Sequence, residues 1–214
     1  MFDFQNDVLE GTAGHRRQKH VHRHLSKASF DLCLSLMLLL PLLILTLVLV
    51  LINPFLNAGP LIFRQSRMGQ DCRAFTAIKF RTMRVEATAV RGAFDALEAD
   101  RIPPLGRFLR KSRLDELPQI INVLRGEMSL IGPRPDAFEH AVVYLKEVPD
   151  YARRYQALPG ISGYAQTEVG YVDGVDGLHR KVAADLYYLA NASFGFDLWI
   201  TWRTLCVVLG CKGS

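Results

Sequence analysis

The feature that most constrains this chain is a long segment without charge. No charged residue occurs in the range 32–63, and Leu36–Ile52 is apolar except for Pro41 and Thr46. A run of about 17 apolar residues reaches the lower length limit for a helix that enters a bilayer. A cleavable secretory signal is a poor interpretation, because the apolar run is too long and Leu56–Ala58 fits a cleavage site badly. The chain therefore carries one membrane element, which excludes a transporter with several spans.

The topology of this membrane element stays open from the residues alone. Pro41 divides the apolar run, and a proline removes one helix hydrogen bond and clashes with the preceding turn. Both flanks are basic, since the range 15–27 carries five Lys or Arg side chains and no acid, and Arg64 and Arg67 follow the run. The positive-inside rule needs an asymmetry that this pattern lacks. A re-entrant helix that breaks at Pro41 fits, and so does a kinked spanning helix. In either case the basic arm is expected on anionic lipid head groups.

Composition narrows the function classes further. Hydrophobic residues make up 50% of the chain and charged residues 22%, which excludes intrinsic disorder. The net charge of +5 equals the charge of the segment 15–27. The rest of the chain is therefore neutral and lacks the positive field of a nucleic-acid-binding protein. The four cysteines show no C-x-x-C spacing, which predicts reduced thiols in a cytosolic setting.

Beyond the apolar run, hydrophobic periodicity and breaker residues predict a mostly α fold with short β segments. Extended segments are expected at 61–63 and 75–80, around a polar turn at 69–71. Stiff turns are expected at 132–135 and 159–163, and a solvated helix or loop at 85–99. The expected helices cover the ranges 105–113, 115–125, 136–146, 151–158, 181–188 and 197–209.

These elements predict that the chain is organised in three parts. A basic arm covers residues 1–26, a membrane helix covers 27–58, and a compact domain on one membrane face covers 59–214. The amphipathic helices at 105–113 and 197–209, the second with Trp199 and Trp202, suit a position at the lipid interface. Both also fit ordinary surface or core helices.

The densest cluster of reactive side chains lies between Arg110 and Gln119. The adjacent acids Asp115 and Glu116 lie near a predicted helix start, where the helix dipole favours negative charge. One interpretation is helix capping. The other is a carboxylate nucleophile for a phosphoryl group, with Mg²⁺ and basic side chains neutralising the developing charge. The candidates for such a clamp are Lys79, Arg81, Arg110 and Arg134.

Six segments carry a resemblance to a known family. They are Lys27–Asp31, Gly59–Gly69, Lys79–Met83, Leu109–Pro135, Pro159–Gln166 and Asp185–Tyr188. In this order and spacing they resemble the monotopic phosphoglycosyl transferases, also called the bacterial sugar transferases. The chain looks like a short form of the family, similar to undecaprenyl-phosphate galactose or glucose phosphotransferases of exopolysaccharide synthesis. The match runs from about residue 27 to the C-terminus.

The resemblance implies a re-entrant helix broken at Pro41 and a catalytic domain on the cytoplasmic face of the bacterial inner membrane. The implied reaction moves a sugar-1-phosphate from a UDP-sugar to polyprenyl phosphate and releases UMP. In the family the aspartate of the acidic pair attacks the β-phosphate, which gives Asp115 the nucleophile's role and makes it the Mg²⁺ ligand, with Glu116 as its partner. The implied substrate-binding residues are Lys79, Arg81, Arg110, Pro133, Arg134 and Asp185.

Some features depart from the family pattern or stay open. The family often has Ser-Pro at the helix break, where this chain has Leu40-Pro41. The acidic stretch 168–177 matches no family motif, and fits either a donor-specific loop or a solvated turn. Apolar surfaces make a homodimer conceivable. A membrane-anchored recruitment module without catalysis and a UDP-sugar hydrolase are the competing functions.

Overall fold

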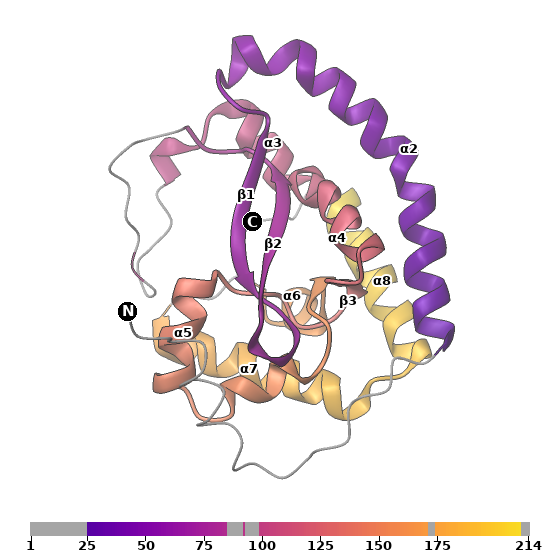
Figure 1. Ribbon diagram of the computed structural model, residues 1–214, viewed down its shortest axis with the longest axis vertical. Helices are drawn as coiled ribbons and strands as arrows, with labels where there is room; N and C mark the ends of the chain where they lie inside the picture. The colour runs from indigo at the N-terminus through magenta and orange to yellow at the C-terminus, as the bar shows by residue number, and fades with distance from the viewer. Residues whose placement is uncertain (1–24, 85–91, 93–98, 171–173, 211–214) are drawn as a thin grey trace.

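The computed structural model describes residues 25–84, 92, 99–170 and 174–210. A long helix, α2, arches along one side of the molecule, and the hairpin β1–β2 stands against the inside of the arch (Figure 1). Shorter helices close the opposite side. The helices are α2 (Leu25–Leu56), α3 (Pro104–Lys111), α4 (Ile120–Leu124), α5 (Phe138–Glu147), α6 (Tyr164–Glu168), α7 (Gly174–Asn191) and α8 (Phe194–Leu209). The 3₁₀ helices are η1 (Gln70–Cys72), η2 (Ala99–Arg101), η3 (Leu114–Gln119) and η4 (Tyr151–Gln156). The strands are β1 (Ile62–Met68), β2 (Ala74–Phe80), β3 (Ser129–Ile131) and β4 (Gly160–Ser162). The mostly helical fold with short strands is confirmed.

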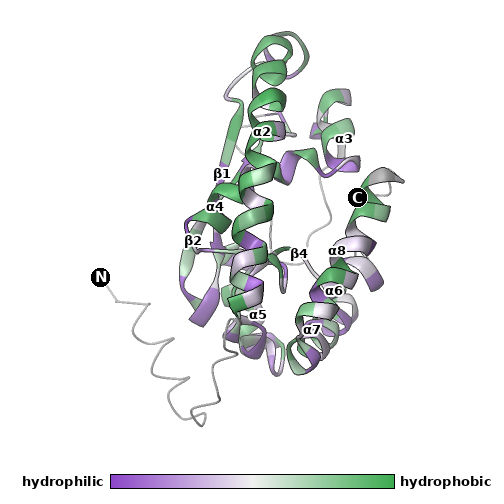
Figure 2. Cartoon of the chain, turned by 90° about the vertical axis from the view of Figure 1, so that its right-hand side faces the viewer, coloured by the Kyte–Doolittle hydropathy of each residue, from purple (hydrophilic) through white to green (hydrophobic). Residues whose placement is uncertain are grey.

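Helix α2 is the one helix among the described residues that is long and apolar enough to cross a membrane. Its outward side is strongly hydrophobic (Figure 2). The predicted break at Pro41 is not present, because α2 continues through both Pro41 and Pro54 on a curved path. A proline inside a helix removes one hydrogen bond and bends the helix. Here packing against the domain on both sides of Pro41 keeps the two halves in one helix.

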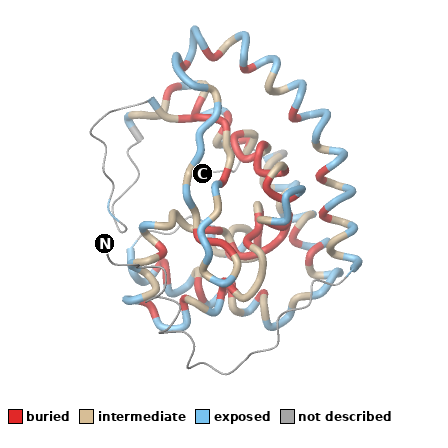
Figure 3. Tube along the Cα trace, in the orientation of Figure 1, coloured by how far each residue is buried: buried red, intermediate tan, exposed pale blue. Residues whose placement is uncertain are grey.

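A single stripe of α2 makes that packing. Its buried residues are Asp31, Ser35, Leu42, Leu49 and Asn53, and Leu38, Leu45 and Ile52 lie between them, partly buried. Figure 3 shows this as buried positions recurring along an otherwise exposed helix. Steps of three and four residues keep all these side chains on one helix face. The stripe contacts α4, η3 and β3.

Polar side chains fix both ends of α2 to the same domain. Near the N-terminal end, the Asp31 carboxylate accepts hydrogen bonds from the Ser129 hydroxyl at 2.8 Å and the Leu130 amide at 3.1 Å. Near the C-terminal end, the Asn57 side-chain amide donates to the Arg81 carbonyl at 3.1 Å. The apolar helix is therefore tied to the domain at both ends, and the domain runs alongside it.

The hairpin confirms the two extended segments predicted around the polar turn. Strands β1 and β2 pair antiparallel, from Ile62 opposite Phe80 to Met68 opposite Ala74. The turn places Asp71 and Cys72 in the left-handed region, at φ 54° and 57°. Strand β2 packs against η3, so the hairpin delivers its side chains to the segment that holds the acidic pair.

The helix predicted over 115–125 forms as two pieces. The first is the 3₁₀ helix η3, which contains Pro118, and the second is α4. Proline has no amide hydrogen to donate to the residue four positions earlier, which disfavours a regular α-helix across this segment. The helix predicted over 151–158 forms as the 3₁₀ helix η4, which ends at Gln156. Most of the segment 85–99 and of the basic arm lies outside the described residues.

The sequence interpretation missed the parallel pair of β3 and β4, and treated 159–163 as a turn only. Each strand has three residues, with Ser129 opposite Gly160. The glycines here are required by close backbone contact. A Cβ on Gly160 would lie 2.1 Å from the Gly132 amide nitrogen, and one on Gly163 would lie 2.1 Å from the Gly132 carbonyl oxygen.

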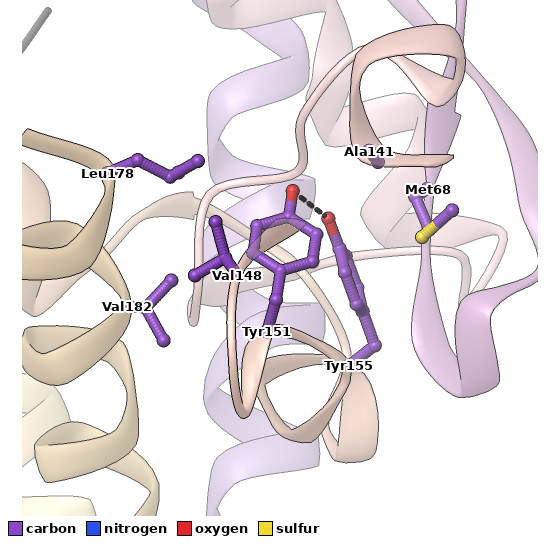
Figure 4. Close-up of a cluster of buried hydrophobic side chains, with 7 residues drawn as sticks. All are labelled: Met68, Ala141, Val148, Tyr151, Tyr155, Leu178 and Val182. Atoms are coloured by element: carbon purple, nitrogen blue, oxygen red, sulfur yellow. Dashed lines mark hydrogen bonds between the residues drawn. The ribbon is translucent and has the colours of Figure 1, made fainter. Parts of the chain in front are cut away.

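A buried cluster joins β1, α5, η4 and α7 on the side away from α2. Figure 4 shows its members, with the Tyr151 and Tyr155 hydroxyls pointing toward one another. They are Met68, Ala141, Val148, Tyr151, Tyr155, Leu178 and Val182. The two hydroxyls lie 2.9 Å apart. This cluster fixes η4, and η4 in turn supports the loop that follows β3.

Candidate active site

The acidic pair lies in the first turn of η3, and the residue before η3 has a left-handed backbone conformation. Arg113 has φ 58° and precedes η3, so the chain turns sharply between α3 and the pair. Both acids are buried, with Asp115 at 7% exposure and Glu116 at 5%. Carboxylates are rarely buried unless they are paired or have a functional task.

Glu116 is paired. The Lys79 ammonium donates to its Oε1 at 2.6 Å, and Arg134 donates to both of its oxygens, with Nη1 at 3.0 Å from Oε2. A two-point arginine–carboxylate contact of this kind is strong and directional. Arg134 and Lys79 hold the pKa of Glu116 well below its usual value, against the opposing effect of burial. Glu116 is therefore a fixed anion.

Asp115 is held differently. Its carboxylate makes no hydrogen bond or ion pair with any other side chain or backbone group in the described part of the chain. Burial, and then the negative charge of Glu116, raise its pKa from 3.8 to about 6. Lys79, Arg134 and Arg110 oppose that rise. Asp115 is thus a buried carboxylate whose oxygens are not committed to a neighbour.

The surroundings of the pair are strongly positive. The basic side chains that interact with the pair are Arg67, Lys79, Arg110, Arg113 and Arg134. Burial, together with the charges of Arg134 and Arg67, lowers the pKa of Lys79 to about 8 despite its contact with Glu116. Burial and the charge of Arg134 lower the pKa of Arg67 to about 10. Such an excess of cations over two carboxylates suits an anionic ligand.

The loop after β3 brings Arg134 to the pair. The Gly132 amide donates to the Ser162 carbonyl, and the Gly160 amide donates to the Pro133 carbonyl, both at 2.9 Å. These bonds explain the place of Pro133, which shapes the loop through its backbone. Arg67 Nη1 donates to the Pro135 carbonyl at 2.5 Å, so β1 also supports this loop.

A buried ionic network lies behind the loop. Arg154 is fully buried, pairs with Asp136 and Asp185, and donates from Nη2 to the Arg134 carbonyl at 2.8 Å. The Arg154–Asp185 distance is 2.6 Å. Arg154 thus lies between Asp185 and Arg134, and Asp185 is connected to the acidic pair only through this network.

The structure brings together most of the predicted site residues. Lys79, Arg134 and Arg110 surround the pair, while Pro133 shapes the loop. Arg81 lies elsewhere. Its guanidinium donates to backbone carbonyls of the segment 57–60, among them Ala58 at 2.9 Å and Pro60 at 2.6 Å, and it fixes the connection between α2 and β1.

Sequence reasoning missed two site residues. Arg67 and Arg113 both belong to segments that carried the family resemblance, yet neither was selected. Arg113 was recognisable from its place two residues before Asp115. Arg67 could be identified only from the register of the hairpin, which places it opposite Phe75 and next to the loop that carries Arg134.

The side chains of the site offer few ligands for a divalent cation. The described residues contain no group of three or more His, Cys, Asp or Glu side chains that could enclose a metal ion. Mg²⁺ needs no such cage, since it commonly takes one or two carboxylates and completes its shell with phosphate oxygens and water. The uncommitted carboxylate of Asp115 fits that requirement, whereas Glu116 is engaged by Lys79 and Arg134.

Comparison with known proteins identifies the class. A model of the family described as bacterial sugar transferase matches residues 22–211. The UDP-glucose:undecaprenyl-phosphate glucose-1-phosphate transferase of Caulobacter vibrioides is 41% identical over 153 residues, which cover 71% of this chain and 55% of that protein. The UDP-N-acetylgalactosamine-undecaprenyl-phosphate N-acetylgalactosaminephosphotransferase of Aeromonas hydrophila is 40% identical over 157 residues, which cover 73% of this chain and 37% of that protein.

A shorter relative is matched over most of its length. The exopolysaccharide production protein PSS of Rhizobium leguminosarum is 38% identical over 153 residues, which cover 69% of this chain and 76% of that protein. The chain spans only about a third to a half of the two larger relatives. The family match covers most of this chain, and helix α2 within it is long and apolar enough to cross a membrane. This protein belongs to the bacterial sugar transferase family.

Proposed function

We propose that this protein transfers a sugar-1-phosphate from a UDP-sugar to polyprenyl phosphate through a covalent intermediate on Asp115, as the first membrane step of exopolysaccharide or glycoconjugate synthesis. The difference between the two acids carries the proposal. Glu116 is bound by Lys79 and Arg134, while Asp115 is buried beside the same cations with its oxygens uncommitted. A nucleophile must be free to form a new bond, and a fixed anion can hold the surrounding cations in place.

The reaction takes place in two displacements. A carboxylate oxygen of Asp115 forms a bond to the β-phosphorus of the UDP-sugar. The bond from that phosphorus to the bridging oxygen breaks, and UMP leaves with the electron pair. A phosphate oxygen of polyprenyl phosphate then attacks the same phosphorus and displaces the Asp115 carboxylate. The product is a polyprenyl diphosphate sugar.

The protein's part is to position the phosphates and neutralise their charge. Arg134, Lys79 and Arg110 surround Asp115 with positive charge that is already in place before substrate binds. Preorganised charge of this kind stabilises a transition state without reorganisation. Bound Mg²⁺, held by Asp115 and substrate phosphate oxygens, would neutralise further charge on the diphosphate.

The membrane element supports a monotopic arrangement. Both ends of α2 are hydrogen-bonded to the same domain, and the stripe between them packs along α4 and η3. If α2 crossed the bilayer, the charged domain packed along it would enter the hydrocarbon, which is unfavourable. We therefore propose that α2 is re-entrant, that it bends without breaking, and that the domain lies at the cytoplasmic face of the inner membrane.

The exposed apolar residues of α3 and α8 fit the same surface. Phe108 on α3 and Trp199 and Trp202 on α8 are exposed. Aromatic side chains of this kind favour the boundary between head groups and acyl chains. We propose that both helices are interfacial. A homodimer and the absence of nucleic-acid binding stay predictions.

The assay for the activity is UMP release. The full chain is incubated with a panel of UDP-sugars, Mg²⁺ and undecaprenyl phosphate, and the lipid product is measured in parallel. Asp115→Asn should abolish both products, and Asp150→Asn, which changes an exposed aspartate in the turn before η4, should retain them. UMP without lipid product would indicate a hydrolase. The proposal would be wrong if the wild-type chain and Asp115→Asn gave no UMP with any donor.

The topology has its own test. Leu25 and Ala58 are exposed residues at the two ends of the apolar segment, and each is replaced by cysteine in a chain whose native cysteines are changed to serine. A re-entrant helix predicts that both positions react with a thiol reagent from the same side of sealed vesicles. Labelling from opposite sides would contradict re-entry while leaving the catalytic proposal intact.

A further inference from the structure

Arg113 has an unusual backbone conformation at the point where the chain enters the site. Its φ of 58° lies in the left-handed region, and this conformation costs a residue with a Cβ roughly 1–2 kcal/mol. Glycine and asparagine are the residues that adopt it readily. A long side chain in a disfavoured conformation next to a candidate nucleophile points to a functional requirement for that side chain.

The contacts of Arg113 do not explain that requirement. Its Nη1 lies 3.9 Å from Glu116 Oε2, which is an ion-pair distance beyond hydrogen-bond range. Its side chain makes no hydrogen bond with another described residue and is 24% exposed. A partly exposed ion pair without a hydrogen bond contributes little to stability. The ion pair between Arg113 and Glu116 therefore does little to stabilise the fold.

Three neighbouring basic groups, by contrast, are engaged. Lys79 and Arg134 donate to Glu116. Arg67 donates to the Pro135 carbonyl and to the Gln65 side chain, with Nη2 at 2.8 Å from Gln65 Oε1. Arg113 differs because its guanidinium donors are available. An arginine with free donors can bind two oxygens of one phosphate group at once.

We propose that Arg113 binds a phosphate group of a substrate, either the diphosphate of the nucleotide-sugar donor or the phosphate of the lipid acceptor. The inference rests on the proposed function, because it takes phosphate-bearing substrates as given. Arg113 lies two residues before Asp115, and it interacts electrostatically with Asp115, Glu116 and Arg134. A phosphate bound by Arg113 would therefore lie beside the carboxylate that attacks phosphorus.

Three variants separate charge from backbone conformation. Arg113→Asn removes the guanidinium and introduces a residue that accepts the left-handed conformation. Arg113→Lys keeps a positive charge but loses the planar two-point donor. Arg125→Gln is the control, since Arg125 is an exposed arginine at the end of α4.

The first measurement needs no turnover. Binding of inorganic pyrophosphate to the full chain in detergent is measured by calorimetry. We expect Arg113→Asn to bind about 10- to 100-fold more weakly than wild type, as the loss of a charged hydrogen bond predicts. Arg113→Lys should be intermediate and Arg125→Gln should match wild type. Arg113→Asn should melt at the wild-type temperature or above, which excludes misfolding as the cause.

Steady-state kinetics then assign the phosphate to its source. A raised KM for the UDP-sugar with an unchanged KM for polyprenyl phosphate places Arg113 on the donor, and the reverse places it on the acceptor. Either result supports the inference. If Arg113→Asn keeps wild-type pyrophosphate affinity and both KM values, Arg113 does not bind phosphate, and the inference is wrong. A wild-type chain that is inactive with every donor would instead refute the proposed function, which separates the two failures.

Discussion

Replacing Asp115 by asparagine should stabilise the folded protein above pH 6 while it abolishes transfer. Burial and the charge of Glu116 raise the pKa of Asp115 from 3.8 to about 6 in the folded chain. Each tenfold change in proton affinity corresponds to about 1.4 kcal/mol. The ionised carboxylate therefore destabilises the fold by about 3 kcal/mol at pH 8.

The sign follows from proton linkage. Because the folded-state pKa of Asp115 exceeds its unfolded value, the folded chain holds the proton more tightly between about pH 4 and 6. The stability from this proton is full below about pH 4 and is lost as the pH rises through about 6. Asparagine resembles the protonated acid and does not ionise. The advantage of Asp115→Asn should therefore be small at pH 4, about half developed at pH 5, and complete above pH 6.

The assay is urea unfolding or pulse proteolysis of both proteins in the same detergent at pH 4, 5, 6 and 8. Asp150→Asn serves as the control, since Asp150 is an exposed aspartate. A stability difference that stays constant with pH would show that Asp115 is not a perturbed acid. A loss of stability at pH 8 would show that the ionised carboxylate stabilises the fold, which refutes the description of the site.

Three further changes have expected outcomes. Glu116→Gln should lower the free energy of unfolding by about 3 kcal/mol in a urea titration at pH 8, because it leaves Lys79 and Arg134 without the anion that pairs with both. An unchanged stability would contradict the pairing. Arg81→Gln should destabilise the fold by about 3 kcal/mol because it removes the hydrogen bonds to the buried Asn57 carbonyl and to the carbonyls of Ala58 and Pro60, with unchanged KM values for any substrate; a selective rise in one KM would make Arg81 a binding residue. Gly160→Ala should prevent folding or greatly reduce the yield of folded protein, because a Cβ there would lie 2.1 Å from a backbone nitrogen; a wild-type melting temperature would contradict that close contact.

The part of the site that lies within one short segment could be identified from the sequence. Asp115, Glu116 and Arg110 lie within one short segment, so any fold keeps them near one another. Lys79 and Arg134 come from other parts of the chain. Their charge made them candidates for a phosphate clamp, and the family resemblance gave both a substrate-binding role. The structure agrees, because β2 packs against η3 and presents Lys79 to Glu116.

Arg81 shows where local reasoning fails. Lys79 and Arg81 are two residues apart, and in a continuing strand their side chains would share one face. Strand β2 ends at Phe80, so Arg81 leaves the strand geometry and reaches the loop after α2. The end of that strand is set by contacts between distant segments, which a single sequence does not reveal.

The helix around the acidic pair shows a second limit. The apolar periodicity of 115–125 predicted one helix, and the structure has a 3₁₀ turn followed by an α-helical turn. Pro118 was the available signal, since it cannot donate the hydrogen bond that an α-helix needs there. At Pro41 the opposite error arose, because packing of α2 on the domain outweighs the effect of the proline. Proline position alone therefore does not locate a helix end.

The most direct test of the central claim is the mass of the peptide that contains Asp115 after reaction with donor alone. The full chain is incubated with a UDP-sugar that supports UMP release, without lipid acceptor, then quenched in acid, digested and analysed by mass spectrometry. The account predicts a phosphosugar on Asp115 that disappears when undecaprenyl phosphate is added before the quench. A phosphosugar on another side chain, or its absence while lipid product forms, would contradict it.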